Sequence, residues 1–147
     1  KETPLNKAYK VIQLIYASYA TREMSNKDLI DLLEKSRQRN TRQNVTGLLL
    51  YAEKKFLQVL EGDIKDVEEI YDAILNDERN MSNVLYDKKT ITEREFPTWT
   101  MGFRHLKKND RDNIEGFSNF LDAGTDLKQY KLTHATLLLS QFKDLTK

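Results

Sequence analysis

Alternating strand-like and helix-like segments predict an α/β fold of the α+β kind, in which one sheet carries the core. Apolar runs rich in Val, Ile, Leu and aromatic residues recur along most of the chain, and two segments between them repeat apolar residues every three or four positions. With 147 residues, 39% of them apolar and 32% charged, the chain has the length and composition of one folded domain.

The first strand is predicted at 11–16, where the sequence VIQLIY is largely apolar and rich in residues that favour strands. A helix is expected at 25–40, because Ser25 and Asp28 have the spacing of a capping box and leucines follow at helical intervals. These two elements begin the sheet and the layer that covers it.

A hairpin of two buried strands is predicted at 45–52 and 55–61, since both segments are nearly continuous in apolar residues and a short polar break separates them. Gly62 and Asp63 end the second of these strands, and Asp63 is suited to cap a helix. That helix is expected to continue to about Asn76, because apolar residues recur there every three or four positions.

Two further strands complete the predicted sheet. The segment 84–92 carries Lys88 and Lys89, charges of the type that protect an exposed sheet edge. The segment 96–106, FPTWTMGFRHL, follows an alternation that places three apolar side chains on one face, namely Trp99, Met101 and Phe103.

The resulting order is β-α-β-β-α-β with an added fifth strand, a ferredoxin-like pattern, and right-handed crossovers place both helices on one face of the sheet. We therefore assign residues 10–106 to a sheet-based domain and residues 107–147 to a C-terminal helical extension, with amphipathic segments at 112–122 and 132–145. The extension is expected either to dock on the uncovered sheet face or to form a dimer or partner interface, and the sequence does not rank these alternatives.

Charge and composition exclude several classes of partner. The 24 basic and 23 acidic residues nearly cancel, so neither nucleic acid nor a membrane surface is expected as a partner. No apolar run approaches the roughly 20 residues that cross a bilayer. The chain has no cysteine, which removes disulfides and thiolate ligands and fits a reducing compartment. We expect a cytoplasmic protein.

No constellation of catalytic residues is recognisable. The two histidines, His105 and His134, lie far apart, and neither has a Ser, Cys or Asp partner at a motif spacing. No glycine-rich phosphate loop is present, and the adjacent Asp77 and Glu78 are more typical of a solvated helix end than of an acid-base pair. We predict neither a metal site nor an enzyme.

One buried amide distinguishes the segment FLQVLEG at 56–62. The neighbours of Gln58 in its strand are apolar on both faces, and an unpaired buried amide costs about 1 to 3 kcal/mol per group. It must therefore have polar partners. Tyr16 and Trp99 are the other polar or aromatic residues within strands, and for both of them ordinary core packing is the alternative interpretation.

Five segments resemble, in order and spacing, those of the BLUF domains, a family of blue-light sensors that bind flavin adenine dinucleotide (FAD) without a covalent bond. The resemblance covers about residues 10–106. The segments are LIYAS at 14–18, NVTGLLLY at 44–51, FLQVLEGD at 56–63, DERN at 77–80 and FPTWTM at 96–101.

The resemblance implies roles for five residues around the flavin ring. Tyr16 would donate an electron and a proton to the excited flavin, and Gln58 would lie between the tyrosine hydroxyl and the flavin ring. Asn40 would hydrogen-bond the edge of the isoalloxazine ring, with a helix C-cap as the alternative. Leu32 and Ile74, one on each helix, would sandwich the apolar part of the ring.

The resemblance also covers the last strand and the segment after the second helix. Trp99 and Met101 would compete for the place beside the glutamine and pass its change to the surface, although core packing is the simpler interpretation. Asp77 and Arg79 would lie near the ribityl and phosphate side of the cofactor, with a solvated helix end as the alternative. Two positions depart from the family's commoner pattern and bear on fine tuning, Arg39 and Asn80.

The sequence therefore predicts a non-enzymatic blue-light photoreceptor that binds FAD. Light-driven electron and proton transfer from Tyr16 would rearrange the hydrogen bonds of Gln58 and signal to a protein partner, with a homo-oligomer as a further option. The alternative is a ferredoxin-like interaction or small-ligand-binding module without a photocycle, which a colourless preparation would indicate.

Overall fold

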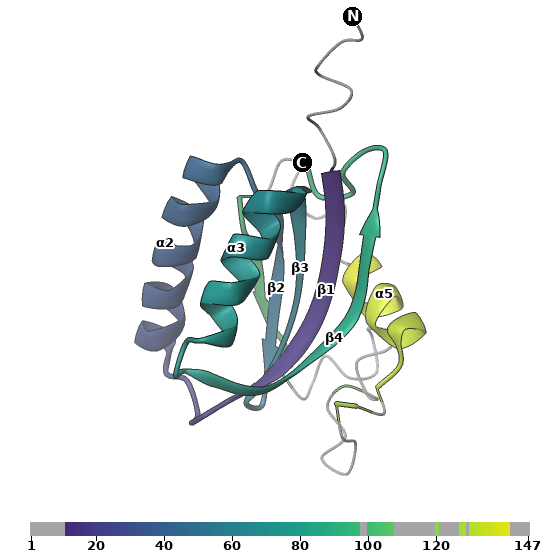
Figure 1. The fold of residues 1–147 in the computed structure, drawn as a ribbon. Coiled ribbons are helices and arrows are strands. Elements are labelled where there is room, and N and C mark those ends of the chain that lie inside the picture. The colour runs from purple at the N-terminus through teal and green to yellow at the C-terminus, as the bar shows by residue number, and fades with distance from the viewer. Residues whose placement is uncertain (1–10, 98–99, 108–119, 121–126, 129, 142–147) are drawn as a thin grey trace, which may run out of the picture.

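The structure is a computed structural model, and it describes residues 11–97, 100–107, 120, 127–128 and 130–141. No helix in these ranges combines the length and apolarity needed to span a membrane. The elements in chain order are β1 (Val11–Ala20), α2 (Asn26–Gln43), β2 (Thr46–Ala52), β3 (Lys55–Asp63), α3 (Ile64–Leu75), β4 (Asn80–Thr90), β5 (Gly102–His105) and α5 (Leu132–Ser140). Figure 1 labels all of them except β5.

The strands form one sheet in the order β4-β1-β3-β2-β5. β1 pairs antiparallel with both β3 and β4, β2 pairs antiparallel with β3, and β5 joins β2 in parallel. The predicted ferredoxin-like arrangement with an added strand is confirmed. β4, which carries Lys88 and Lys89, lies at one edge of the sheet, and β1 and β3 are inner strands.

Each face of the sheet is covered by its own layer of helix (Figure 1). α2 and α3 lie together on one face, as predicted, and we call this the helix-pair face. Leu33 of α2 and Ile70 of α3 belong there to one buried cluster with Leu60 of β3. α5 lies on the opposite face, the α5 face, where Leu138 belongs to a second buried cluster with Val59 of β3. The inner strands are therefore buried on both sides.

The two helices of the helix-pair face begin where their caps were predicted. The side chain of Ser25 accepts the N–H of Asp28, and the carboxylate of Asp28 accepts the N–H of Ser25, which forms the capping box of α2. The helix continues almost one turn beyond its predicted end and stops at Asn44, which has a left-handed φ of 55° that asparagine tolerates. Asp63 caps α3 with its side chain.

The last strand is shorter than predicted. The alternation favoured a strand at 96–106, but β5 comprises Gly102–His105, and Trp99 lies outside the described residues. β4 and β5 lie at opposite edges of the sheet, so the chain that joins them has to cross from one edge to the other. We call its described residues, 91–97 and 100–101, the crossover segment.

Candidate functional site

Tyr16 and Gln58 face each other across the two inner strands. Tyr16 of β1 pairs directly with Gln58 of β3, so both side chains rise from the same rung on the helix-pair face. The Tyr16 hydroxyl donates a hydrogen bond to Oε1 of Gln58, and each residue is only 3% exposed. The backbone register thus brings the predicted electron donor and the predicted switch amide into contact.

The other end of the Gln58 amide is also paired. Its Nε2 donates to Sδ of Met101 at 3.3 Å, and Met101 is buried just before β5. The amide therefore lies between a phenol that donates and a thioether that accepts. This arrangement provides the polar partners that the burial of Gln58 requires.

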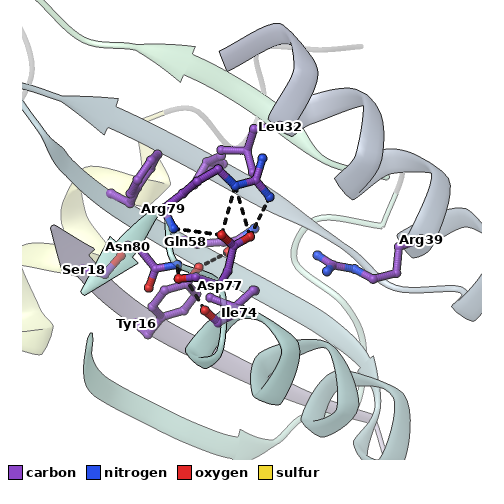
Figure 2. Close-up of a pocket in the computed structure, with 11 residues that line it drawn as sticks. Tyr16, Ser18, Leu32, Arg39, Gln58, Ile74, Asp77, Arg79 and Asn80 are labelled. Atoms are coloured by element: carbon purple, nitrogen blue, oxygen red, sulfur yellow. Dashed lines mark hydrogen bonds and ion pairs between the residues drawn. The ribbon is translucent and has the colours of Figure 1, made fainter. Parts of the chain in front are cut away.

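A pocket opens beside this pair, between the sheet and the two helices of the helix-pair face (Figure 2). Six of the seven residues predicted to bind the cofactor line it, and Asn40 is the exception. The six are Tyr16, Leu32, Gln58, Ile74, Asp77 and Arg79. The pocket is completed by Ser18, Arg39, Leu49, Phe56 and Asn80.

Asn40 lies outside the pocket lining but is linked to the segment that carries Met101. Its side chain is fully buried, and its Nδ2 donates to the backbone carbonyl of Thr100 at 2.8 Å. Its Oδ1 has no hydrogen-bond partner among the residues that the structure describes. Because α2 ends at Asn44, the alternative interpretation of Asn40 as a helix C-cap is wrong.

Arg39 and Ser18 are pocket residues that the sequence did not assign to the site. Figure 2 shows the Arg39 side chain reaching from α2 toward the pocket, and its buried Nε has no hydrogen-bond partner in the described part of the chain. Burial lowers the pKa of the Arg39 guanidinium, while the neighbouring Tyr16 and Asp77 act in the opposite direction. The Oγ of Ser18 is likewise buried and unpaired. Strand parity could have identified Ser18, which lies two residues from Tyr16 on the same face.

Asp77 and Arg79 form a partly exposed ion pair in the pocket wall. Arg79 Nη2 lies 2.5 Å from Asp77 Oδ2, and Arg79 Nε lies 3.0 Å from Asp77 Oδ1. These hydrogen bonds lower the pKa of Asp77 and raise that of Arg79. The neighbouring Asn80 donates from Nδ2 to the carbonyl of Ile74 at 3.1 Å and so closes the end of α3.

The surroundings of Tyr16 keep its phenol protonated. Burial is the main cause that raises the pKa of Tyr16 far above its ordinary value, Tyr71 adds to the effect, and Arg39 opposes it. The ring centroids of Tyr16 and Tyr71 lie 5.1 Å apart. Because a charged form is unfavourable in a buried site, Tyr16 can be oxidised readily only if its proton moves to the acceptor that it already contacts, Gln58 Oε1.

The pocket suits a flat aromatic group with one polar edge. Arg39, in the pocket lining, has an N–H donor without a partner among the described residues, and the next residue, Asn40, has such an amide oxygen outside the lining. The isoalloxazine ring of a flavin is flat, and its pyrimidine edge carries both carbonyl acceptors and an N–H donor. The apolar surface for such a ring comes from Leu32, Leu49, Phe56 and Ile74.

No metal centre accompanies this pocket in the part of the chain that the structure describes. In those ranges, no group of three or more His, Cys, Asp or Glu side chains could hold a metal ion. His105 instead packs its ring against Tyr51, at a centroid distance of 5.2 Å. The chemistry of the described site therefore rests on a phenol, an amide and unpaired polar groups.

Comparison with known families gives a match over most of the sheet domain. Residues 11–102 match the family described as BLUF, sensors of blue-light using FAD. The photoactivated adenylate cyclase subunit beta of Euglena longa is 37% identical over 89 residues, which are 60% of this chain and 10% of that protein. The chain thus spans about a tenth of the length of the first curated relatives that it matches.

Solved structures share the fold as well. BlrB, a BLUF protein in its dark state, superposes with a TM-score of 0.70 and 27% identity, covering 90% of this chain and 98% of that chain. Klebsiella pneumoniae BlrP1, solved with FMN and cyclic diGMP, gives a TM-score of 0.60 and 27% identity over 65% of this chain and 26% of that one. The family match spans the strands and helices that carry Tyr16, Gln58 and the pocket.

Proposed function

Because this chain belongs to the BLUF family of blue-light sensors, we propose that it is a blue-light photoreceptor whose signal begins at Gln58. One observation carries the proposal. A continuous chain of hydrogen bonds runs from the Tyr16 hydroxyl through the Gln58 amide to the Met101 sulfur, beside a pocket that suits a flavin. The first link offers a path for a proton, and the last offers a way to pass on a change in the amide.

The flavin is proposed to be FAD. Leu32 and Ile74 would hold its ring, Arg39 and Asn40 its polar edge, and Arg79 its phosphates. The Arg79 side chain is 39% exposed and paired only with Asp77 among the described residues, so it can turn toward a phosphate. Releasing the flavin by heat and measuring its mass distinguishes FAD from FMN, which is the flavin in the BlrP1 structure.

The chemical steps of the chain begin at Tyr16. A bound flavin would supply an electron acceptor on absorbing blue light. Tyr16 would then give one electron to that acceptor, and its hydroxyl proton would follow through Gln58, whose Oε1 already accepts its hydrogen bond. When the electron and the proton return, Tyr16 is restored, so the cycle causes no net oxidation.

The lasting change is proposed to lie in the Gln58 amide. An amide oxygen accepts hydrogen bonds and the amide nitrogen donates them, so a turned amide presents Nε2 to the Tyr16 oxygen and Oε1 to Met101. Met101 Sδ would then lose the donor that it has at 3.3 Å. A single hydrogen bond is worth only about 0.5 to 1.5 kcal/mol, so a packed element with two arrangements is needed to amplify the change. The crossover segment, which ends at Met101, is the proposed element, and the competing role of Trp99 stays a prediction.

The output of the domain is proposed to reach a protein partner. Two of the proteins named above, the Euglena longa adenylate cyclase subunit and BlrP1, are longer than this chain, and the Euglena longa protein is photoactivated by name. We propose that this domain senses light and that any catalysis belongs to what it regulates. A homo-oligomer and a cytoplasmic location stay predictions.

A light-minus-dark absorption spectrum of the purified chain tests the proposed function. We expect a yellow protein whose flavin band moves to the red under blue light and returns in the dark. Tyr16→Phe should keep the flavin and lose the red shift, since it removes only the hydroxyl that contacts Gln58. A colourless protein that takes up neither FAD nor FMN would favour an interaction or small-ligand module instead.

A further inference from the structure

Glu61 is a fully buried carboxylate that the proposed photochemistry does not use. It lies on β3, three residues beyond Gln58, on the opposite face of the sheet. Its exposed fraction is 0%, and a carboxylate in such a place must have several hydrogen-bond donors around it. The identity of those donors indicates what Glu61 holds.

The donors to Glu61 come mainly from the backbone of the crossover segment. The N–H of Phe96 donates to Oε1 at 2.9 Å, and the N–H of Glu95 donates to Oε2 at 3.1 Å. The third donor is Nε2 of Gln13, at 2.7 Å from Oε2, which comes from the directly paired position on β1. Glu61 therefore supplies the acceptors that a neighbouring strand would have supplied to this segment.

The crossover segment joins this anchor to the switch. Phe96 is buried in the cluster of the α5 face, together with Leu139 of α5. Met101, five residues later, is buried in the cluster of the helix-pair face, where its sulfur accepts from Gln58. Glu61 thus fixes one end of a stretch whose other end contacts the amide.

The remaining anchors of Met101 do not replace Glu61. Asn40 holds the carbonyl of Thr100, and Arg37 donates to the carbonyl of Met101 at 3.0 Å, so both act close to the sulfur itself. Arg94 is bound to the Oγ1 of Thr46 and therefore anchors the segment before residue 95. Glu61 is the anchor that combines full burial with bonds to two consecutive N–H groups.

We propose that Glu61 is a positioning residue of the photocycle, which sets how firmly Met101 is held against Gln58 and thereby the lifetime of the light state. This inference rests on the proposed function. Recovery in the dark requires Met101 Sδ and Gln58 Nε2 to meet again, so a crossover segment that is less firmly anchored passes between its two arrangements more readily. Glu61 acts through Met101 and touches neither Tyr16 nor the pocket lining.

The test is the rate at which the red shift decays in the dark in Glu61→Gln. The amide keeps the shape of the side chain but replaces one acceptor oxygen by a donor, which then faces a backbone N–H. We expect the normal flavin content and red shift, with a dark recovery about fivefold faster, the factor expected from losing one hydrogen bond. A recovery rate equal to that of the unchanged protein would overturn the proposal.

A matched control separates positioning from stability. Glu93→Ala removes an exposed side chain of the same segment that is not among the donors to Glu61, so its recovery rate should be unchanged. Leu50→Ala destabilises the same buried cluster of the α5 face without touching the anchor, and it should lower the melting temperature without speeding recovery. If Leu50→Ala speeds recovery as much as Glu61→Gln, the effect is one of general stability and the proposal is wrong.

A second variant tests the proposal if Glu61→Gln does not fold. Gln13→Leu leaves Glu61 in place and removes the amide that donates to its carboxylate and, at 3.2 Å, to Glu95 Oε1, so recovery should speed up in the same direction and to a smaller extent. An unchanged rate in Gln13→Leu would also count against the proposal. If the unchanged protein itself shows no red shift, the proposed function has failed, and that outcome is distinct from a normal red shift with an insensitive recovery rate.

Discussion

Single residues set the chemistry of this site, and Gln58 is the clearest case. One buried amide has a phenol at its oxygen and a thioether at its nitrogen. The two partners of the amide differ in their hydrogen-bonding ability. The thioether of Met101 can only accept a hydrogen bond, whereas the Tyr16 hydroxyl can either donate or accept one. The amide can therefore take two orientations that differ in which partner is well satisfied.

Gln58→Leu should keep the flavin and abolish the red shift, because no amide remains to turn. The Tyr16 hydroxyl would also lose its acceptor in a buried position, so the free energy of unfolding should fall by about 1 to 3 kcal/mol. Light-minus-dark spectra and urea unfolding of the same preparation measure both effects. A normal red shift in this variant would contradict the assigned role of Gln58.

Arg39 is the residue whose role depends most on the cofactor. Its Nε is buried and has no partner within the described ranges, and burial lowers the pKa of its guanidinium, so without a ligand the charge is poorly solvated. Arg39→Leu should weaken flavin binding by about tenfold or more, the factor expected from a hydrogen bond to a charged group. The same change should raise the melting temperature of the flavin-free protein. Fluorescence titration with FAD and thermal unfolding check the two expectations.

Arg42→Leu is the matched control for Arg39. Arg42 lies on the same helix, is exposed and does not line the pocket, so its replacement should change neither flavin affinity nor the melting temperature of the flavin-free protein. Equal losses of affinity in the two variants would indicate a general charge effect. In that case Arg39 would not be assigned to the flavin edge.

At the scale of elements, the capping box of α2 carries a measurable pH dependence. The hydrogen bond from Arg22, followed by those from Ser25, lowers the pKa of Asp28 from its ordinary 3.8 to about 2. The folded pKa lies below the unfolded one, so the stabilisation is present above pH 3.8 and is lost as the pH falls toward 2. Asp28→Asn should flatten the fall in melting temperature over this range. An unchanged pH profile would contradict the role of Asp28.

Most elements could be predicted because their signals are local. Periodicity and caps identified α2 and α3, and continuous apolar runs identified the inner strands, which are buried on both faces. The crossover segment could not be predicted, because its alternation imitates a strand while its backbone is bound by the side chain of Glu61, which is distant in sequence. A local pattern does not contain that long-range contact.

The candidate site was predictable to a similar extent. Burial alone indicated that Gln58 needs partners, and the family resemblance named Tyr16 as one of them, but only the register of β1 and β3 places the two on one rung. Arg39 was noticed as a departure from the family pattern and not as a pocket residue, since its lack of a partner is a property of the folded chain.

At the scale of the whole molecule, the sheet lies between two separate cores and contributes residues to each of them. The helix-pair face holds the pocket, and α5 contributes to the second core on the other face. β1 and β3 supply residues to both buried clusters. A change in the packing of one cluster therefore affects strands that also form the other cluster. The stability of the α5 face is therefore part of the support of the light-sensing site.

Two adjacent leucines of α5 test this second layer. Leu138 is 0% exposed and Leu137 is 38% exposed. Leu138→Ala should lower the free energy of unfolding by about 2 to 5 kcal/mol, whereas Leu137→Ala should change it by less than about 0.5 kcal/mol. Urea unfolding of the two variants measures the difference. Equal effects would show that α5 does not pack on the sheet through Leu138.

The pairing of Tyr16 with Gln58 on one rung of the sheet has a practical consequence. A slip of one residue between β1 and β3 would turn one of the two side chains to the opposite face, so the hydrogen bond exists only in the native register. If the red shift depends on that hydrogen bond, the red shift reports whether β1 and β3 are paired in the correct register. Refolding can then be followed by absorption, because the amplitude of the red shift under blue light measures the fraction of molecules in which β1 and β3 are paired in the native register.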